Sequence, residues 1–505
     1  MYRKSSLQAI AIRHKAPTVL HPLQRFRLPR LLIPLKELRS VKTKLQPQSE
    51  SVSASTGAAP AQSTPFQTTW TVFWVAFLVR VLYITLAHTY HLRTGQDHFE
   101  FGYEMGRVAQ ALATGHGYAD PFIGHTGPTT WVPPLYPLLL AGVFKLFGVY
   151  TLRSAWVILT INSFFSALTT LTTYEIAARC FNRRVALWSA WIWALYPAAM
   201  QYAVRWVWDM TLSTWLLSLI LVLALRMRRI GEISFPADPS SSHNPGRTLR
   251  RWVIFGVLWG VLALSNPSLL LFLPACGLWV LHGTGHWRRQ AGYASISALV
   301  FILCISPWTI RNALAFHRFI PMRANFGAEL YLGNGPGAMG FLMEYNHPYE
   351  APDQLRLYKQ MGEVEYAQMR GRLAKKYIEN HPGLFFRNSL KRLYFFWVSV
   401  PHPTGDAWFI EPVRVTNFAF ASLAGLLGLA LALKRRMPAA WLFAWAFLLI
   451  PLIYYFVTVH ARFRNPLEPL IAILAVYLFQ SAEKRWPRWI RSDSTVDGPS
   501  GNQYS

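Results

Sequence analysis

The chain has 505 residues, of which 52% are hydrophobic, 15% aromatic and only 14% charged. Soluble domains carry about 25% charged residues, so this composition excludes an ordinary soluble protein. The formal net charge is +27. The lysines and arginines stand in short clusters between apolar runs, where the positive-inside rule of membrane proteins places them. No nucleic-acid partner is therefore expected.

Residues 1–68 contain no apolar run that could form a core. The stretch 1–48 is basic and has a single acid, Glu37, and the stretch 48–68 is rich in Ser, Ala, Thr, Pro and Gln. Such a composition predicts a disordered basic cytoplasmic tail, although a misassigned start codon would produce the same pattern. A signal peptide is not favoured, because no compact apolar core precedes a small-residue cleavage site.

Apolar runs near the length that spans a bilayer, about 20 residues, recur after this tail. The run 252–283 is too long for one crossing and is divided at Asn266-Pro267. The expected transmembrane helices are 70–89, 154–178, 185–203, 207–226, 252–266, 268–283, 291–310, 415–433, 438–457 and 466–481.

The apolar segment 134–149 is short and contains Pro137 and Lys145. If it does not cross the membrane, all the basic loops face the cytoplasm, as the positive-inside rule requires. We therefore expect an interfacial helix at the outer surface, ten spans, and both termini in the cytoplasm. The basic segments that decide this are 180–184, 227–251, 286–290, 434–437 and the tail from Glu483.

This topology divides the chain into five parts. They are the tail 1–68, an N-terminal transmembrane catalytic module 69–310 with a first external loop 90–152, an external loop region 311–414, C-terminal transmembrane helices 415–482 and a cytoplasmic tail 483–505. Within the external region, 355–380 has the pattern of one amphipathic helix, and 384–399 that of an interfacial one.

Acidic residues are scarce, yet three gather in the first external loop: Asp97, Glu100 and Glu104. Helical spacing over 99–113 predicts that Glu100 and Glu104 share a face. These acids are candidate catalytic groups, and a solvated helix start is the alternative.

Asp209 stands at the external start of the fourth span, between Trp208 and Met210. An acid at the edge of the bilayer is costly unless it is used or paired. Asp209 is therefore a further catalytic candidate, with a structural pair to Arg205 as the alternative.

Arg462 and Arg464, between the last two spans, break the positive-inside trend. Paired arginines can hold a phosphate through bidentate hydrogen bonds, so they are candidate donor-phosphate ligands, with Arg311 as a third. Lipid headgroup contact is the alternative. Glu329 and Asn334 are candidate substrate-binding residues, and a fold-stabilising role is the alternative for them and for Arg311.

The three cysteines show no metal-ligand spacing, and no other ligand set is specific. No cofactor is therefore firmly expected, and a divalent metal is left open.

Several of these segments, taken in order, resemble the bacterial GT-C glycosyltransferases of the protein-mannosyltransferase and aminoarabinose-transferase (ArnT-like) type. The segments are FGYEMGRVAQALATGHGY, TGPTTWVPPLYPLLLAGVFKLFG, NRRVALWSAWIWALYP with RWVWD, LALSNPSLL, PWTIRN with ELYLGNG, and ARFRNPLEP. The resemblance covers about 70–480. The expected fold is thus an all-α polytopic GT-C-like bundle of about ten transmembrane helices with external interfacial helices and a small external α-rich region.

The resemblance implies a hexosyl- or pentosyltransferase of the bacterial inner membrane. Such an enzyme takes a sugar from a polyprenyl-phosphate carrier at the outer, periplasmic face and passes it to an envelope lipid, glycan or protein. It also implies one catalytic acid in the first external loop and a second after the third span. The chain departs from the aminoarabinose type where an Asp-Glu pair is expected, because Phe101-Gly102 stand there. The first-loop acid is therefore chosen among Glu104, Glu100 and Asp97.

Two other functions fit a polytopic chain. A transporter or flippase of lipid-linked sugars is expected to show internal repeats and polar, broken helices at the midplane. We find no repeat, and Arg80 is the one charge well inside an expected span, where an arginine can extend toward the interface. A non-catalytic scaffold would not need acids and phosphate-binding arginines on one face.

The topology is tested by reporter fusions. Fusions at Ser240 and Ser492 are expected to report the cytoplasm, and fusions at Gly117 and Pro352 the exterior, because loop charge sets the orientation. An external signal at Ser240 would contradict the ten-span arrangement.

Overall fold

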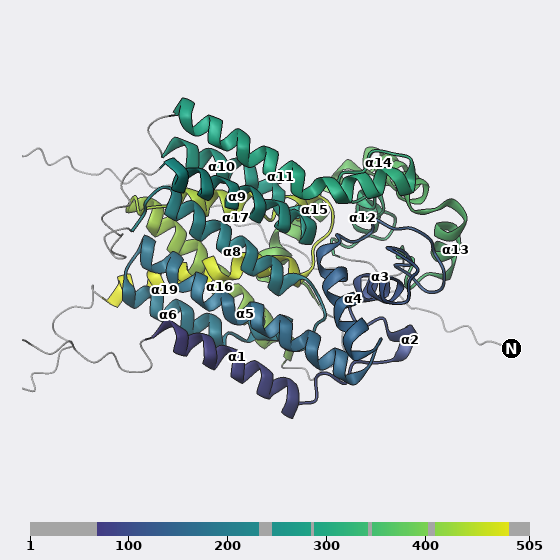
Figure 1. Ribbon diagram of the computed structural model, residues 1–505, viewed down its shortest axis with the longest axis horizontal. Coiled ribbons are helices and arrows are strands. Elements are labelled where there is room, and N and C mark those ends of the chain that lie inside the picture. Colours follow the sequence, from purple (N-terminus) through teal and green to yellow (C-terminus); the bar gives the residue numbers. More distant parts are fainter. Residues whose placement is uncertain (1–67, 232–244, 284–286, 342–345, 402–409, 484–505) are drawn as a thin grey trace, which may run out of the picture. The chain divides into compact units, whose positions relative to one another are not determined.

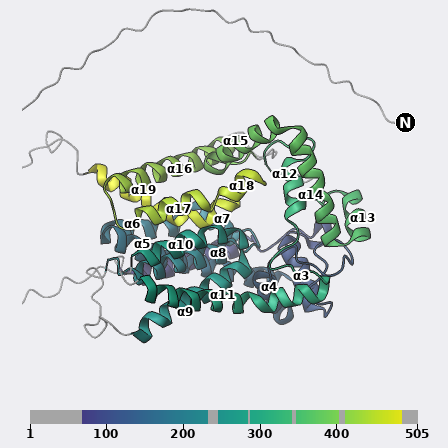
Figure 2. The ribbon, with the colours of Figure 1, turned by 90° about the horizontal axis from the view of Figure 1, so that it is seen from above.

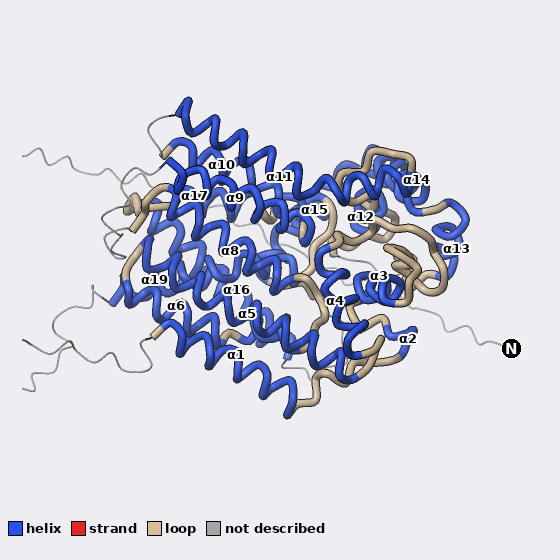
Figure 3. Tube along the Cα trace, viewed as in Figure 1, coloured by secondary structure: helices blue, strands red, loops and turns tan. Residues whose placement is uncertain are grey.

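The computed structural model describes residues 68–231, 245–283, 287–341, 346–401 and 410–483. Within these ranges every regular element is a helix, apart from an isolated bridge between Ala119 and Pro128 (Figure 3). The predicted all-α class is confirmed. The two predicted cytoplasmic tails lie outside the described residues, except for their innermost positions.

The first half of the chain supplies nine helices among the described residues. They are α1 (Thr69–Leu86), α2 (Gly95–His98), α3 (Tyr103–Ala113), α4 (Leu135–Phe147), α5 (Leu152–Cys180), α6 (Arg183–Leu195), α7 (Pro197–Val204), α8 (Met210–Met227) and α9 (Pro245–Ser265).

The second half continues with two 3-10 helices and the remaining α-helices. They are η4 (Pro267–Phe272), α10 (Leu273–His282), α11 (Trp287–Phe316), α12 (Phe326–Asn334), α13 (Pro352–Met361), α14 (Glu363–Asn380), α15 (Pro382–Val398), α16 (Ile410–Lys434), α17 (Ala440–Leu449), α18 (Leu452–Phe456), η6 (Ala461–Leu467) and α19 (Glu468–Glu483).

Six of the described helices are long and apolar enough to cross a membrane: α1, α5, α8, α9, α11 and α16. Shorter apolar helices occupy Leu135–Phe147, Pro267–His282 and Ala440–Phe456. The chain is thus a multi-pass membrane protein. Each of the ten expected spans falls on one helix or on two consecutive helices, while the number that cross and the interfacial place of α4 stay predictions.

The long helices pack side by side in a bundle (Figures 1 and 2). Helix α5 contacts α1, α6 and α8, α9 packs on α11, and α16 packs on α19. At Gly428 of α16, an added Cβ would lie 2.1 Å from the backbone oxygen of Leu474. A glycine is required there, because small residues let two membrane helices approach through their backbones.

Three of the helices expected to be continuous are broken. The expected span 185–203 is divided into α6 and α7 before Pro197, and the span 438–457 into α17 and α18 near Pro451. Proline lacks the N–H that would continue a helix. The single amphipathic helix expected over 355–380 is wrong, because Gly362, with φ 77°, separates α13 from α14.

Helices α2, α3, α4, α12, α13 and α14 gather at one end of the bundle (Figure 1). A buried carboxylate, Glu363 at the start of α14, joins two parts of this end. Its oxygens accept hydrogen bonds from the hydroxyl and backbone N–H of Thr130, the hydroxyl of Thr129 and the hydroxyl of Tyr358. The first external loop and α14 are therefore held together by one side chain.

Replacing Glu363 with Ala is expected to destabilise the fold by about 2–4 kcal/mol, because buried donors of Thr129, Thr130 and Tyr358 would lose their acceptor. The measurement is thermal unfolding of the purified protein in detergent. The matched control is Glu365→Ala, since Glu365 is half-exposed and pairs with Arg318 at the surface. Equal unfolding midpoints for the two variants would contradict the role of Glu363.

Candidate functional site

A cavity of about 1300 Å³ lies between the helix bundle and the helices that gather at one of its ends. Its walls come from α3, α7, the start of α8, the turn between α9 and η4, the start of α12, the start of α16, α18 and η6. Its charged and imidazole side chains are Glu104, Asp209, Glu329, Glu411, Arg205, Arg323, Arg414, Arg462, His347 and His460. Much of the remaining wall is aromatic or aliphatic.

Glu104 lines this cavity from the first turn of α3. The helix begins there because Gly102, with φ 113°, turns the chain in a conformation that favours glycine. The Glu104 side chain is 12% exposed, and its Oε1 lies 3.5 Å from Nε2 of His347. Burial raises the pKa of Glu104, an effect that its backbone hydrogen bond, Arg462, Arg323 and Arg107 oppose. Burial lowers the pKa of His347 to about 4, so this imidazole is neutral at pH 7.

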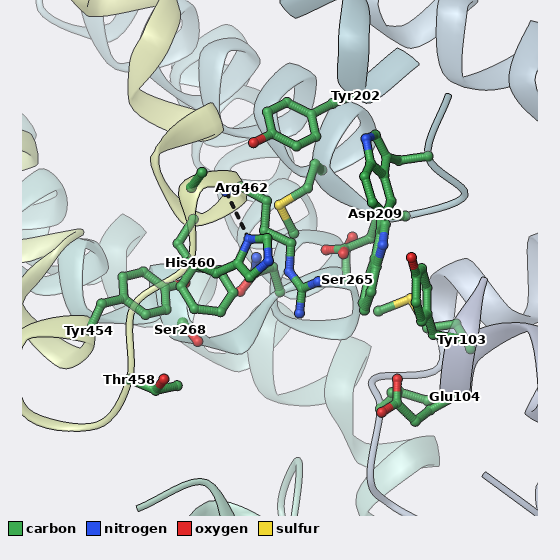
Figure 4. Close-up of a pocket in the computed structure, with 18 of the residues that line it drawn as sticks. Tyr103, Glu104, Tyr202, Asp209, Ser265, Ser268, Tyr454, Thr458, His460 and Arg462 are labelled. Atoms are coloured by element: carbon green, nitrogen blue, oxygen red, sulfur yellow. Dashed lines mark hydrogen bonds between the residues drawn. The ribbon is translucent and has the colours of Figure 1, made fainter. Parts of the chain in front are cut away.

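Asp209 faces the same cavity from the residue before α8 (Figure 4). Its carboxylate does not cap the helix; instead, Oδ2 accepts a hydrogen bond of 2.9 Å from the Ser213 hydroxyl. The residue is 2% exposed, and burial raises its pKa to about 6 against the opposing effects of Ser213 and Arg462. Among the described residues no ion pair joins Asp209 to Arg205, which is exposed. The alternative structural pair is therefore not observed.

Arg462 is held by aromatic rings. Its guanidinium carbon lies 3.8 Å from the ring centre of Trp208 and 5.3 Å from that of Phe463. In the described part of the chain no carboxylate lies within ion-pair distance of it. Cation–π contact can hold an arginine without neutralising it. The cavity thus keeps a positive charge that faces both Glu104 and Asp209 (Figure 4).

Arg464, the second candidate ligand of the donor phosphate, does not line the cavity. Its side chain is 1% exposed, and Nε donates a hydrogen bond of 2.5 Å to Oε1 of Glu468. Its Nη1 donates to the backbone oxygens of Trp397 and Phe418 and to the hydroxyl of Ser422. The geometry argues against a phosphate role, because a buried ion pair occupies the guanidinium.

Arg311 also uses its hydrogen-bond donors within the fold. It donates to the backbone oxygens of Thr129 (2.7 Å) and Tyr118 (2.5 Å) and to the side chain of Asn312 (3.1 Å). These bonds join the end of α11 to the first external loop. Arg311 is absent from the cavity wall, so the geometry favours the fold-stabilising alternative.

The other two first-loop acids lie away from the cavity. Asp97 pairs with Arg107 at 2.8 Å, and its side chain is 57% exposed. Glu100 accepts a hydrogen bond from the backbone N–H of Arg93. The predicted shared face of Glu100 and Glu104 is wrong, because α3 begins at Tyr103, after Glu100. Of these three acids, the structure brings Glu104 to the site.

The two candidate substrate-binding residues also separate. Glu329 lines the cavity, where Asn325 donates to its carboxylate and Arg323 lies 3.8 Å away. Asn334 is buried outside it, donates to the backbone oxygen of Phe456 and accepts from Arg392. Asn334 therefore connects α12 to the end of α18. This geometry favours a fold-stabilising role over substrate binding.

The sequence analysis missed several residues of the cavity wall. Arg323 and His347 come from the external region, and Tyr103, next to Glu104, stacks on Trp208 with ring centres 4.8 Å apart. No motif marks the first two. The sequence did contain a signal for the buried partner of Arg464. Glu468 follows it by four residues, the spacing of an intrahelical ion pair.

No family model and no curated protein matches the chain. Among solved structures it is similar to the archaeal oligosaccharyltransferase AglB from Archaeoglobus fulgidus in complex with an inhibitory peptide and a dolichol-phosphate. The TM-score is 0.49 and the identity 15%, over 82% of this chain and 50% of that one. The same oligosaccharyltransferase in complex with Zn and sulfate has a TM-score of 0.47 and an identity of 14%, over 82% and 49%.

The chain is also similar to ArnT from Cupriavidus metallidurans bound to undecaprenyl phosphate. Here the TM-score is 0.37 and the identity 15%, over 82% of this chain and 77% of that one. The two similar proteins are GT-C glycosyltransferases, the type that the sequence resembles. The chain spans about half the length of the oligosaccharyltransferase. At TM-scores below 0.5 these likenesses carry no argument for activity.

The contrast between the two arginines is testable through stability. Arg464→Met is expected to destabilise the fold by about 3–5 kcal/mol, because it leaves the carboxylate of Glu468 buried without its partner. Arg462→Met is the matched control and is expected to keep the wild-type unfolding midpoint, since no ion pair is lost. Thermal unfolding in detergent measures both. A larger loss for Arg462→Met would contradict the assignment.

Proposed function

We propose that the chain is a membrane glycosyltransferase that moves a hexosyl or pentosyl group from a polyprenyl-phosphate carrier to a hydroxyl of an envelope lipid, glycan or protein. The observation that carries this proposal is the arrangement of Arg462. A cation without a carboxylate partner faces the same cavity as two buried acids, Glu104 and Asp209. Such a site is suited to a reaction in which an anion departs while a proton is removed.

The cavity is proposed to take the phosphate of the donor at Arg462. Its guanidinium has donors for phosphate oxygens and lies 3.8 Å from the ring centre of Trp208, a contact that helps to hold it in the cavity. Arg323 is the second cation, because it lines the same cavity and acts electrostatically on both Glu104 and Asp209. Arg464 and Arg311 have no part in this proposal.

The rim of the cavity supports a lipid-linked donor. Several lining residues are apolar and exposed on the helical surface: Tyr83 (40%), Leu271 (41%), Ile410 (42%) and Phe326 (57%). These residues belong to α1, η4, α16 and α12. A cavity with charged groups inside and apolar groups at its edge suits a charged headgroup with a hydrocarbon chain, since the chain can stay in the bilayer.

The chemistry proposed for the site is a displacement at the anomeric carbon. The acceptor oxygen forms the new glycosidic bond, the bond from that carbon to the phosphate oxygen breaks, and the carrier phosphate leaves with both electrons. The transition state has oxocarbenium character. Arg462 stabilises the departing anion, and a carboxylate takes the proton of the acceptor hydroxyl.

Asp209 is the better candidate for that base. A general base works best with a pKa close to the operating pH, and burial brings the pKa of Asp209 to about 6. One of its oxygens accepts from Ser213, which fixes the carboxylate. Glu104, beside the neutral imidazole of His347, is proposed to orient the acceptor or the sugar. Glu329 remains a candidate substrate contact.

A divalent metal stays open. Among the described residues no group of three or more His, Cys, Asp or Glu could hold an ion. Glu104 and His347 would supply two ligands, fewer than the three or four protein ligands of zinc sites. These two residues by themselves do not make a complete zinc site.

The proposed location is the inner membrane of a bacterium, with the cavity at the periplasmic or outer face. This follows from the loop charges, because the cavity lies at the helix ends opposite to the basic loops 180–184 and 434–437. A carrier lipid of the outer leaflet would reach the cavity from the side.

The function is tested with the purified protein, a series of synthetic polyprenyl-phosphate sugars and total envelope extract as the acceptor. We expect carrier phosphate to be released only with a matching sugar, and Arg462→Ala to lower the rate at limiting donor by about ten- to a hundred-fold, the effect of one lost charge-assisted contact. Arg153→Ala, at an exposed arginine at the start of α5, is the control. Movement of intact donor between leaflets without release would instead indicate a flippase.

The role of Asp209 is tested by pH. The ratio kcat/KM, which reports the free enzyme, is expected to fall as the pH is lowered through about 6, because the base must be ionised and burial raises its pKa to that value. Asp209→Asn is expected to lower the rate by at least about a hundred-fold, within the usual effect of a general base, with normal folding. A wild-type pH profile in Asp209→Asn would move the base to Glu104.

A further inference from the structure

Helix α7 forms one wall of the cavity. It supplies five lining residues, Pro197, Met200, Gln201, Tyr202 and Val204. It exists as a separate helix because Tyr196, before Pro197, has an extended backbone with φ −67° and ψ 120°. A residue before proline favours this conformation. Helix α6 therefore ends at Leu195, and α7 begins at Pro197.

This break leaves backbone oxygens without their usual partners. In a continuous helix, Trp193 would accept from the N–H of residue 197 and Ala194 from that of residue 198. Pro197 has no N–H, and the extended Tyr196 interrupts the ladder. An unpaired carbonyl in a membrane bundle is costly, since no water reaches it.

Arg80, in the middle of α1, supplies the missing donors. One terminal nitrogen donates to the backbone oxygen of Ala194 at 2.7 Å, and the other to that of Trp193 at 3.2 Å. The first nitrogen also donates to the backbone oxygen of Ala76 in α1 itself, at 2.9 Å. The side chain is 0% exposed, so Arg80 does not extend to the interface as the sequence allowed.

The same part of the chain also holds the other end of α7. The hydroxyl of Thr89, three residues after α1, donates to the backbone oxygen of Val204 at 2.6 Å. Between the two anchors, Tyr83 of α1 lines the cavity. Helix α1 and the residues after it therefore hold the end of α6, just before α7 begins, and the end of α7 itself.

We propose that Arg80 is a positioning residue: it stabilises the break between α6 and α7 and so holds α7 as the substrate-binding wall of the cavity. Arg80 itself touches no substrate. Asp209 is fixed separately by Ser213. Loss of Arg80 should therefore weaken substrate binding more than the chemical step.

The experiment is a double-mutant cycle with Arg80→Met, Pro197→Ala and the double variant. Arg80→Met removes the donors, and the midpoint of thermal unfolding is expected to fall by several degrees. Pro197→Ala restores an N–H that Trp193 can accept. The double variant is therefore expected to recover most of the lost stability. Arg153→Met, at the exposed start of α5, is the matched control and should equal the wild type.

The kinetic part rests on the proposed function and uses a polyprenyl-phosphate sugar as the probe. We expect KM for this donor to rise about ten-fold in Arg80→Met and to stay raised in the stable double variant, with kcat within about two-fold of the wild type. A merely structural role would lower the amount of active protein and leave KM unchanged.

The outcomes separate the two proposals. If the wild type transfers no sugar from any donor, the proposed function fails, while the stability cycle still tests the link between Arg80 and Pro197. If the wild type is active, additive stability effects or a wild-type KM in both Arg80 variants would overturn the positioning role. A double variant with restored stability and a restored KM would overturn it as well, since the break would then not be needed.

Discussion

Backbone oxygens at the ends and breaks of helices need donors, and in a bundle surrounded by lipid water cannot supply them. Buried arginines meet this requirement at several places around the cavity. Arg80 serves the end of α6, and Arg392 serves the ends of α12 and α18 through the backbone oxygens of Gly333 and Phe456. Arg464 serves the end of α15 through the backbone oxygen of Trp397. One guanidinium has enough donors to satisfy several oxygens at once.

This requirement explains how a large polar cavity can exist in an otherwise apolar bundle. The wall is built largely from helix ends: the broken α7, the turn after α9, the first residues of α12 and α16, and η6 after α18. Helix ends bring polar backbone and side chains to one place (Figure 4). The arginines that stabilise these ends use their hydrogen-bond donors within the fold, whereas Arg462, in contact with the ring of Trp208, faces the cavity.

The same low-dielectric surroundings set the chemistry of the acids. Burial raises the pKa of Glu104 and of Asp209, and Arg462 and Arg323 oppose this effect at both sites. The two carboxyl groups are therefore more basic than in water, and an anionic ligand at Arg462 would raise their pKa further. In the proposed reaction, binding of the donor phosphate thus changes the pKa of the catalytic base.

The sequence by itself indicated the helical class, and it predicted ten apolar spans with scarce acids and unusual arginines at one membrane face. These features depend on composition and local spacing, which lipid constrains strongly. It also pointed to Glu104, Asp209, Glu329 and Arg462, which share the cavity. Their catalytic and binding roles stay predictions.

Tertiary structure decided which of the candidate site residues line the same cavity. Arg464 and Arg311 look as suitable as Arg462 in sequence, but Glu468 and the backbone of the first external loop occupy them. Asp97 pairs with Arg107 and Glu100 accepts from the backbone of Arg93, and neither lines the cavity. Arg323 and His347 reach the cavity from a distant segment. Whether a charged side chain is free depends on its partners in space, and spacing along the chain does not contain that information.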